Sequence, residues 1–378
     1  MEQKIKVAHV IRVFSYGGAE ILLREFFTNP IFQQAVSSHL YILDHKKLGL
    51  VPEVQPHVRK VRHYKISSLI FPFEYIKFLR DITRGKYDIV HMHLPVAGWL
   101  TIPAKMFTGK TKFVYSEHNL VTFYAKYNYY LSGLVYRFFD CVIYVSKEVG
   151  EVIKKVGNKW FFHAERSVMI LNGTDTDKFS NAHRASENIL QQFTVGLVAR
   201  FRPQKRVDRW VEVAYETHKL NPDIKFLMVG DGPDDEMLRE KIERLGMNDK
   251  IELPGMLSDT LSAFKRMDIF LLTSDFEGLP LALMEAMSTG CVPVVSNVGG
   301  IKQLEFDGFG KKFDGFDPKQ IAKTIAVYAS NPENFRKESA CAREFIQRNY
   351  SLTKQVEEVL NLYKDLVGST SGSMIKRT

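Results

Sequence analysis

The sequence predicts an α/β protein made of two doubly wound, parallel-sheet domains in tandem. A buried strand at Lys4–Phe14 leads into the turn Ser15–Glu20, which opens a helix at Ile21–Phe27. The same succession of strand, loop and helix begins again at Phe193–Val198 and Ala199–Lys205. A length of 378 residues gives each half enough chain to bury a core of its own.

The first half, residues 1–185, continues with short apolar segments separated by helical stretches. These predicted strands are Ser38–Leu43, Asp88–His93, Lys112–Ser116 and Cys141–Ser146. The turn after Lys4–Phe14 lies at the carboxyl end of its strand, where open α/β sheets bind ligands. It carries Gly17 and Gly18 but does not read Gly-x-Gly-x-x-Gly, so a dinucleotide cofactor is disfavoured.

The second domain is predicted over residues 186–350, after the turn Asn172–Asp175 and the polar linker Ser180–Gln192. Its further strands are Ile224–Val229, Ile251–Leu253, Ile269–Leu272 and Val292–Val295, with helices at Val207–His218 and Asp235–Leu245. A last helix over residues 351–366 has an apolar face that needs a surface to cover, and we expect it to pack back on the first domain. Residues 367–378 are expected to form a flexible tail.

The stretch Ser274–Gly308 organises the second half. Pro280 stands where a helix would begin, because its fixed φ and missing N–H suit a first helical turn. The backbone N–H groups between Gly278 and Leu281 would then form an anion cradle at the positive end of the helix dipole. Two carboxylates, Glu277 and Glu285, flank this cradle with seven residues between them. A second turn, Gly299-Gly300, is expected to face the same crevice.

The loop that follows the strand Phe193–Val198 is basic. Arg200 and Lys205 can hold both phosphates of a diphosphate, Arg as a planar fork and Lys as a point charge. Arg202 and Arg206 lie in the same loop, and an ordinary solvated basic loop is the alternative interpretation.

Histidines supply a further candidate. His118 follows the strand Lys112–Ser116, a position suited to hydrogen-bonding a sugar hydroxyl or assisting proton transfer; a structural histidine is the alternative. His91 and His93 share a strand face, but the sequence shows no third or fourth zinc ligand, so no metal site is predicted. Asp175-Thr-Asp177 reads as turn chemistry.

Charge divides the chain unevenly. Residues 1–185 hold 26 Lys and Arg against 15 Asp and Glu, whereas residues 186–378 hold 26 against 28. The basic half favours an anionic membrane surface over nucleic acid. The segment Val58–Lys86 mixes cations with aromatics and is expected either to lie on a bilayer or to be an ordinary amphipathic helix.

Other features point to the cytoplasm. Cys141, Cys291 and Cys341 are unevenly spaced in apolar surroundings and form no disulfide or metal-ligand pattern, which indicates a reducing compartment. Neither a signal peptide nor a membrane span is predicted. We therefore expect a cytoplasmic protein, with peripheral contact at the membrane face.

Taken together, these motifs resemble the retaining glycosyltransferases of the GT-B fold, family 4. The resemblance extends from Gly17-Gly18 through D-I-V-H-M-H, S-E-H-N, V-A-R-F-R-P-Q-K, V-G-D-G-P and E-G-L-P-L-A-L-M-E to the final helix. It implies two Rossmann-like domains facing across a cleft, the first binding the acceptor and the second a nucleotide sugar. A UDP-sugar is expected over a GDP-sugar, the acceptor would be a glycan or lipid-linked glycan, and neither a cofactor nor a metal would be required.

The resemblance also implies roles for single residues. Glu285 would bind the ribose hydroxyls and Glu277 the donor sugar. Arg200 and Lys205 would neutralise the departing diphosphate. From the first domain, Gly17 and Gly18 would allow backbone to approach that diphosphate, and His118 would lie by the reacting sugar.

Two positions depart from the family's usual pattern. Arg206 stands where glycine often follows the lysine, and Asn119 stands where aspartate is frequent. Two alternatives stay open: a catalytically silent protein of the same fold that binds a nucleotide sugar or a partner transferase, and a nucleotide-sugar epimerase.

Overall fold

The computed structural model describes residues 3–46, 48–66, 71–118, 132–158, 166–180, 192–257 and 259–368. These residues form two compact units. The first holds the chain up to Asn172 together with the residues from Thr353 onward, and the second runs from Gly173 to Leu352. The predicted linker Ser180–Gln192, except for its two end residues, and the tail after Gly368 lie outside the described residues.

The first unit is built on a seven-stranded parallel sheet. Its strands are β1 (Ile5–Ile11), β2 (Val36–Ile42), β3 (Lys60–His63), β4 (Ile89–His93), β5 (Lys112–Glu117), β6 (Cys141–Tyr144) and β7 (Ser167–Met169). The strand order is β3-β2-β1-β4-β5-β6-β7, so the order reverses between β1 and β4. Such a reversal opens a crevice at the carboxyl ends of the strands, where α/β folds bind ligands.

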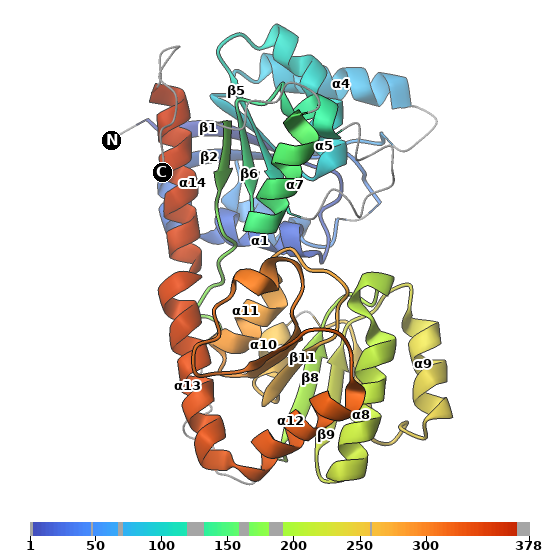
Figure 1. The fold of residues 1–378 in the computed structure, drawn as a ribbon. Helices are drawn as coiled ribbons and strands as arrows, with labels where there is room; N and C mark the ends of the chain where they lie inside the picture. The colour runs from blue at the N-terminus through green and yellow to red at the C-terminus, as the bar shows by residue number, and fades with distance from the viewer. Residues whose placement is uncertain are drawn as a thin grey trace. The chain divides into compact units, whose positions relative to one another are not determined.

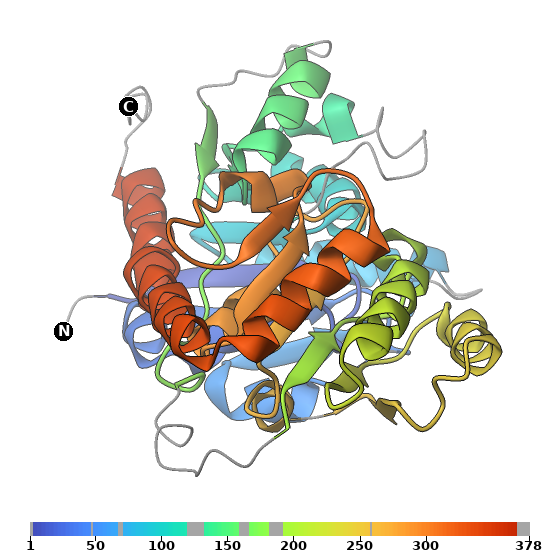
Figure 2. The same cartoon turned by 60° about the horizontal axis from the view of Figure 1, so that its bottom comes forward.

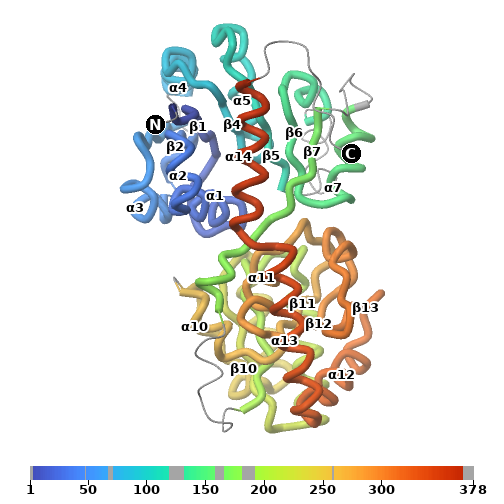
Figure 3. Tube along the Cα trace, turned by 90° about the vertical axis from the view of Figure 1, so that its left-hand side faces the viewer, coloured from blue at the N-terminus to red at the C-terminus, as the bar shows by residue number. Residues whose placement is uncertain are grey.

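Helices cover both faces of this sheet (Figure 1). They are α1 (Gly18–Thr28), α2 (Pro30–Ala35), α3 (Val51–Val54), α4 (Phe71–Arg84), α5 (Pro95–Thr101) and α7 (Lys147–Asn158), with short 3-10 turns η1 (Gln55–His57) and η2 (Ile102–Phe107). The C-terminal helix α14 (Leu352–Gly368) runs across the strands of this unit in Figure 3. Its Tyr363 is fully buried and packs against Phe32 of α2 and His91 of β4.

The second unit repeats the same architecture on six parallel strands. They are β8 (Thr194–Val198), β9 (Lys225–Val229), β10 (Ile251–Gly255), β11 (Ile269–Leu272), β12 (Val292–Ser296) and β13 (Lys311–Phe313). The order β10-β9-β8-β11-β12-β13 reverses between β8 and β11. Because β8, β11 and β12 are almost wholly buried, they read as continuous apolar runs rather than alternating ones.

The helices of the second unit are α8 (Val207–Leu220), α9 (Asp235–Arg244), α10 (Thr260–Phe264), α11 (Leu281–Ser288), α12 (Pro318–Ser330) and α13 (Pro332–Asn349), with 3-10 turns η5 (Pro203–Lys205) and η6 (Gly299–Gln303). Figure 2 shows α8 and α12 side by side over one part of the sheet. Trp210 of α8 is fully buried and donates its indole N–H to the Leu271 carbonyl of β11 at 3.1 Å, which fixes this helix on the sheet.

The fold confirms the predicted pair of doubly wound sheets and corrects several details. The edge strands β3, β7 and β13 were not predicted, because runs of three or four partly exposed residues carry little hydrophobic pattern. The segment Val58–Lys86 is not one amphipathic element: it contains β3 and α4, and its Tyr64 and Phe78 are fully buried. Cys341 is exposed rather than set in apolar surroundings. Within the described residues, no helix is long and apolar enough to cross a membrane.

Candidate active site

Three loops meet at the strand-order reversal of the second unit. The first leaves β8 and carries Arg200 and Lys205; the second leaves β11 and carries Glu277; the third leaves β12 and forms η6. All three lie at the carboxyl ends of neighbouring parallel strands, which is why residues far apart in sequence come together here.

Glu277 lies at the centre of this meeting point. Its side chain is 5% exposed, and its Oε1 accepts hydrogen bonds from Lys205 Nζ at 2.7 Å and from Ser274 Oγ at 2.5 Å. A buried carboxylate needs such partners, because an unpaired charge out of water is costly. The structure thus brings together two predicted site residues, and it adds Ser274, which the sequence pattern did not single out.

The backbone of Glu277 is fixed by the turn after β12. Gly300 N–H donates to the Glu277 carbonyl at 2.9 Å. Gly299 has φ +54°, and a Cβ there would lie 1.8 Å from the same carbonyl oxygen. Only glycine fits this close approach. The predicted Gly299-Gly300 turn therefore reaches the site, but its Gly300 amide holds Glu277.

The basic loop is anchored against the loop that follows β9. Phe201 N–H donates to the Asp231 carbonyl at 2.7 Å, and Phe201 itself is buried. A Cβ on Gly230 would lie 1.8 Å from the Ala199 carbonyl oxygen, and one on Gly232 would lie 2.1 Å from the Phe201 carbonyl oxygen. The motif V-G-D-G-P thus supplies the glycines that let the two loops touch.

Arg200 is the second cation of this loop. Its Nε is buried and has no hydrogen-bond partner among the residues that the structure describes. Buried donors are normally paired, so an unpaired guanidinium N–H at the carboxyl edge of the sheet makes Arg200 a candidate for contacting an anion.

Glu285 lies on α11, half-buried, eight residues after Glu277, which precedes the helix. Pro280 is the N-cap residue of this helix, so the helix begins at Leu281, one residue later than predicted. Gly278 and Leu279 are buried in the connecting turn.

The first unit carries the remaining predicted site residues. Gly17 is the N-cap of α1 and Gly18 its first residue, so the two glycines form the turn after β1 as expected.

His118 follows β5, its Nε2 is buried without a partner among the described residues, and burial lowers its pKa to about 4. His118 lines a small cavity of about 20 Å³, together with His91, His93 and Ser116. Asn119 lies outside the described residues.

A buried histidine cluster adjoins that cavity. Parallel pairing of β1 and β4 sets His9 beside His91, and ring nitrogens of His9, His91 and His93 lie within 4.8 Å of one another. Sequence reasoning missed His9, because the register of two strands that are distant in sequence places it there.

Hydrogen bonds hold most of this cluster, and His9 Nε2 is the ring nitrogen of the three that is buried without a partner among the described residues. His91 uses both ring nitrogens, Nδ1 with Tyr363 Oη at 2.6 Å and Nε2 with Ser116 Oγ at 2.7 Å, while His9 Nδ1 pairs with His93 Nε2 at 3.3 Å. Burial lowers the pKa of all three rings well below 6.5, so they are neutral at neutral pH. A metal bound here would take a ring nitrogen of His91 away from Tyr363 or Ser116, whereas the rings as they stand already hydrogen-bond to neutral partners.

Asp175 has the turn role expected of it. Its Oδ1 accepts hydrogen bonds from the amides of Asp177 at 3.1 Å and of Lys178 at 2.9 Å. This is an Asx-type turn rather than a pair of metal ligands.

The sequence matches the models of two protein families. The sequence model described as "Glycosyltransferase Family 4" matches residues 33–178, and the one described as "Glycosyl transferases group 1" matches residues 179–345. The two matches adjoin and together cover residues 33–345, which include parts of both units. The chain is a GT-B glycosyltransferase.

Relatives of this glycosyltransferase align over most of its length. A UDP-Gal:alpha-D-GlcNAc-diphosphoundecaprenol alpha-1,3-galactosyltransferase of Escherichia coli is 28% identical and covers 96% of the chain and 98% of the relative. A capsular polysaccharide biosynthesis glycosyltransferase, CapH of Staphylococcus aureus, is 26% identical over 78% of the chain and 82% of its own length. Alr3699/HepE of Anabaena, solved in complex with UDP-glucose, has the same fold, with a TM-score of 0.83 and 18% identity over 96% of this chain and all of that one.

Proposed function

We propose that this glycosyltransferase transfers a sugar, with retention of configuration and without a metal ion, from a UDP-sugar to a glycan or lipid-linked glycan in the synthesis of a surface polysaccharide or glycoconjugate. The observation that carries the proposal is the Lys205–Glu277 pair at the strand-order reversal, in which Lys205 comes from the same loop as Arg200 with its unpaired, buried Nε. A UDP-sugar is supported by the printed activity of the Escherichia coli relative and by the UDP-glucose complex of the Anabaena protein. The acceptor class is supported by the diphosphoundecaprenol-linked sugar that the same relative uses.

In this proposal the Lys205–Glu277 ion pair opens when the donor binds, and each residue contacts a different part of the donor. The donor diphosphate takes the Lys205 ammonium, and Arg200 donates to the same phosphates, so two cations neutralise the charge that a metal would otherwise balance. Glu277, still hydrogen-bonded by Ser274, accepts a hydrogen bond from a hydroxyl of the donor sugar. Glu285 accepts hydrogen bonds from the ribose hydroxyls.

The chemical step needs no dedicated base. The bond between the anomeric carbon and the phosphate oxygen breaks while the acceptor oxygen bonds to that carbon from the same face, which retains the configuration. The acceptor proton passes to the departing phosphate oxygen. Lys205 and Arg200 stabilise the charge that develops on the diphosphate, and this preorganised charge is the chain's main contribution to rate.

Transfer of radiolabelled sugar tests the proposal. Wild-type protein with a panel of UDP-sugars and lipid-linked acceptors should form labelled product, and Glu277→Ala should not. Equal absence of transfer by both proteins across the panel would support the catalytically silent alternative. UDP release without any acceptor, together with an isomerised or free sugar, would support the epimerase.

We also propose peripheral contact with an anionic membrane, through a surface that we call the α4/η2 surface. It comprises the exposed side chains of Phe71, Phe73, Ile76, Met106 and Phe107, with the cations Lys77, Arg80 and Lys110 beside them. Phe73 is 78% exposed, Met106 84% and Phe107 74%. Large apolar side chains this exposed, next to cations, suit a bilayer interface with anionic headgroups. Met106 and Phe107 were missed because they come from a different segment of the chain than Val58–Lys86.

Vesicle co-sedimentation tests the α4/η2 surface. Binding to vesicles with anionic lipid should exceed binding to neutral vesicles and should fall about tenfold in Phe73→Ser/Phe107→Ser. Val327→Ser, which removes a similarly exposed apolar side chain from α12, is the matched control and should bind like wild type. Binding that ignores lipid charge and both serine substitutions would refute the membrane role and leave transfer untouched.

A further inference from the structure

Arg206 has a backbone conformation that its side chain does not favour. It has φ 48° and ψ 50°, in the left-handed region, and it is the only non-glycine residue with positive φ among the described residues of the second unit. A Cβ in this conformation crowds the backbone, so glycine is the usual occupant. A glycine often follows the lysine in the family that this chain resembles, and it would adopt this backbone conformation without strain. The arginine therefore brings a side chain to a position where the backbone favours glycine.

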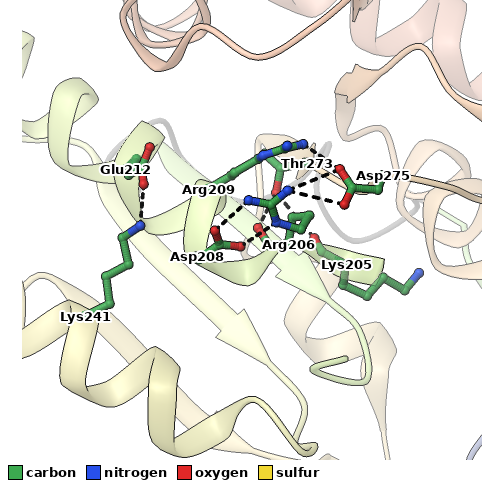
Figure 4. A network of polar contacts seen from close by, with 8 residues as sticks. All are labelled: Lys205, Arg206, Asp208, Arg209, Glu212, Lys241, Thr273 and Asp275. Carbon is green, nitrogen blue, oxygen red and sulfur yellow. Dashed lines mark hydrogen bonds and ion pairs between the residues drawn. The ribbon is translucent and has the colours of Figure 1, made fainter. Parts of the chain in front are cut away.

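The Arg206 side chain joins two loops. Its Nε and Nη2 donate to the two carboxylate oxygens of Asp208 at 3.0 and 2.9 Å, and its Nη1 reaches Asp275 at 3.3 Å (Figure 4). Arg209 donates to the same Asp275 at 2.7 Å. The fork to Asp208 holds the pKa of that carboxyl below its usual value. The guanidinium therefore ties the start of α8 to the loop after β11.

Further hydrogen bonds to backbone carbonyls join the same two loops, the basic loop after β8 and the loop after β11. Thr273 Oγ1 donates to the Arg206 carbonyl at 3.0 Å, and Asp275 N–H donates to the Gln204 carbonyl at 2.9 Å. Gln204 Nε2 in turn donates to the Phe276 carbonyl at 3.2 Å. These contacts involve the immediate neighbours of Lys205 on one loop and of Glu277 on the other.

We propose that Arg206 is a positioning residue: its bridge between Asp208 and Asp275 holds the basic loop against the loop after β11, so that Lys205 and Glu277 keep a fixed separation when the donor enters. The inference rests on the proposed function of that pair. Arg206 makes no contact with the donor in this account. Its left-handed backbone is tolerated in exchange for the bridge, whereas a glycine would adopt the same turn without joining the loops.

The decisive variant is Arg206→Gly, because it separates backbone strain from the bridge. Glycine relieves the strained conformation, so the melting temperature should stay within about 2 °C of wild type or rise. Transfer should nevertheless fall about tenfold in kcat/KM, with most of the loss in kcat, because a looser Lys205 stabilises the departing diphosphate less well. Amide hydrogen exchange should accelerate in residues 204–206 and 274–278.

Two further variants test whether Arg206 and Asp275 act together. Asp275→Asn should reduce kcat/KM severalfold, and the double variant with Arg206→Gly should lose little more than the glycine variant alone. Arg206→Lys should recover only part of the activity, since a lysine cannot bond both carboxylates as a fork. Arg266→Ala, which breaks the exposed Arg266–Glu252 pair elsewhere in the same unit, is the matched control and should keep wild-type kinetics.

The outcomes distinguish this inference from the proposed function. If Glu277→Gln and Lys205→Ala strongly reduce transfer while Arg206→Gly keeps wild-type kcat/KM and wild-type exchange rates, the positioning role is wrong and the proposed site stands. If Glu277→Gln and Lys205→Ala both transfer sugar normally, the proposed site itself is wrong. A glycine variant with lower activity and a melting temperature far below wild type would mean that Arg206 only stabilises the fold.

Discussion

The two strand-order reversals of this chain share a topology and differ in charge. Between β8 and β11, loops of the second unit bring a lysine and a buried glutamate together, and the loop that carries the lysine also carries Arg200, whose Nε is buried and unpaired among the described residues. Between β1 and β4, the first unit gathers buried neutral histidines instead. The same sheet order therefore creates two places for chemistry, and the side chains decide their use. Paired charges suit a diphosphate, whereas neutral rings suit hydrogen bonds and structural packing.

The largest expected effect comes from removing the charges of the second unit. Glu277→Gln and Lys205→Ala should each lower sugar transfer by about 10²–10³-fold, because each removes a group placed for the charge of the departing phosphate or for the sugar it leaves. Steady-state transfer assays measure this. His91→Asn, in the first unit's neutral network, should lower activity much less if the comparison holds. An equal loss in His91→Asn would break the comparison.

Next in size is the effect of a methyl group at Gly299. Gly299→Ala should destabilise the second unit by about 3 kcal/mol or more, because the left-handed strain adds to a clash with the Glu277 carbonyl. Gly246 has φ +67° and no atom within 4 Å of its built Cβ, so Gly246→Ala carries the strain without the clash. We expect that control to cost about 1 kcal/mol. Chemical denaturation compares the two, and similar losses would show that the close approach to Glu277 does not matter.

The histidine cluster should make the first unit sensitive to acid. Its lowered pKa values mean that the unfolded chain takes up protons near pH 6.5 while the folded chain does not, so stability is complete above about pH 6.5 and falls as pH drops below it. Each such ring contributes up to about 1.4 kcal/mol per pH unit. Buried His118 and half-buried His39, whose pKa values fall to about 4, add to the same slope.

His9→Phe sharpens this prediction. The ring of His9 already packs edge-on against Phe27 at 5.0 Å, so phenylalanine should fit, and the slope of unfolding free energy between pH 5 and pH 6.5 should decrease by about one proton. Denaturant titrations across this range give the slope. Asp208 and Glu252, whose lowered pKa values come mainly from their arginine partners, affect stability only at lower pH. A slope unchanged by His9→Phe would mean that His9 is protonated in the folded protein.

The smallest effect belongs to a charge pair outside both reversals. Arg266 and Glu252 form an ion pair whose side chains are 52% and 50% exposed. Arg266→Ala should change stability by less than about 1 kcal/mol and leave transfer unchanged, because exposed pairs are screened by water and salt. A large loss of activity in this variant would show that charge anywhere in the second unit matters, not the pair at the reversal.

Much of this architecture was predictable from the sequence, because buried parallel strands and glycine turns leave a local signal. The strand Ile269–Leu272 was predicted with the bounds of β11, and Glu277 and Lys205 were chosen from their loops. Ser274 was not chosen, since a serine in a polar turn carries no signal until its distance to Glu277 is known. His9 needed the register of β1 on β4, and Met106 with Phe107 needed the packing of η2 beside α4. Contacts between distant segments are what one sequence does not contain.

Arg206 also shows that contacts between distant segments cannot be predicted from one sequence. The resemblance to the family marks it as a departure from glycine, and the backbone angle and the two carboxylates show what the arginine does there. A local pattern identified the position, and tertiary contacts supplied the reason.

Calorimetric titration with UDP and with uridine tests the central claim most directly, that Arg200 and Lys205 receive a diphosphate at the second unit's strand-order reversal. Wild-type protein should bind UDP at least about a hundredfold more tightly than uridine, since two charge-assisted contacts to phosphate contribute a few kcal/mol. Arg200→Ala/Lys205→Ala should bind both compounds with similar, weak affinity while remaining folded. UDP and uridine binding equally to wild type, or a double variant that still prefers UDP, would contradict the account.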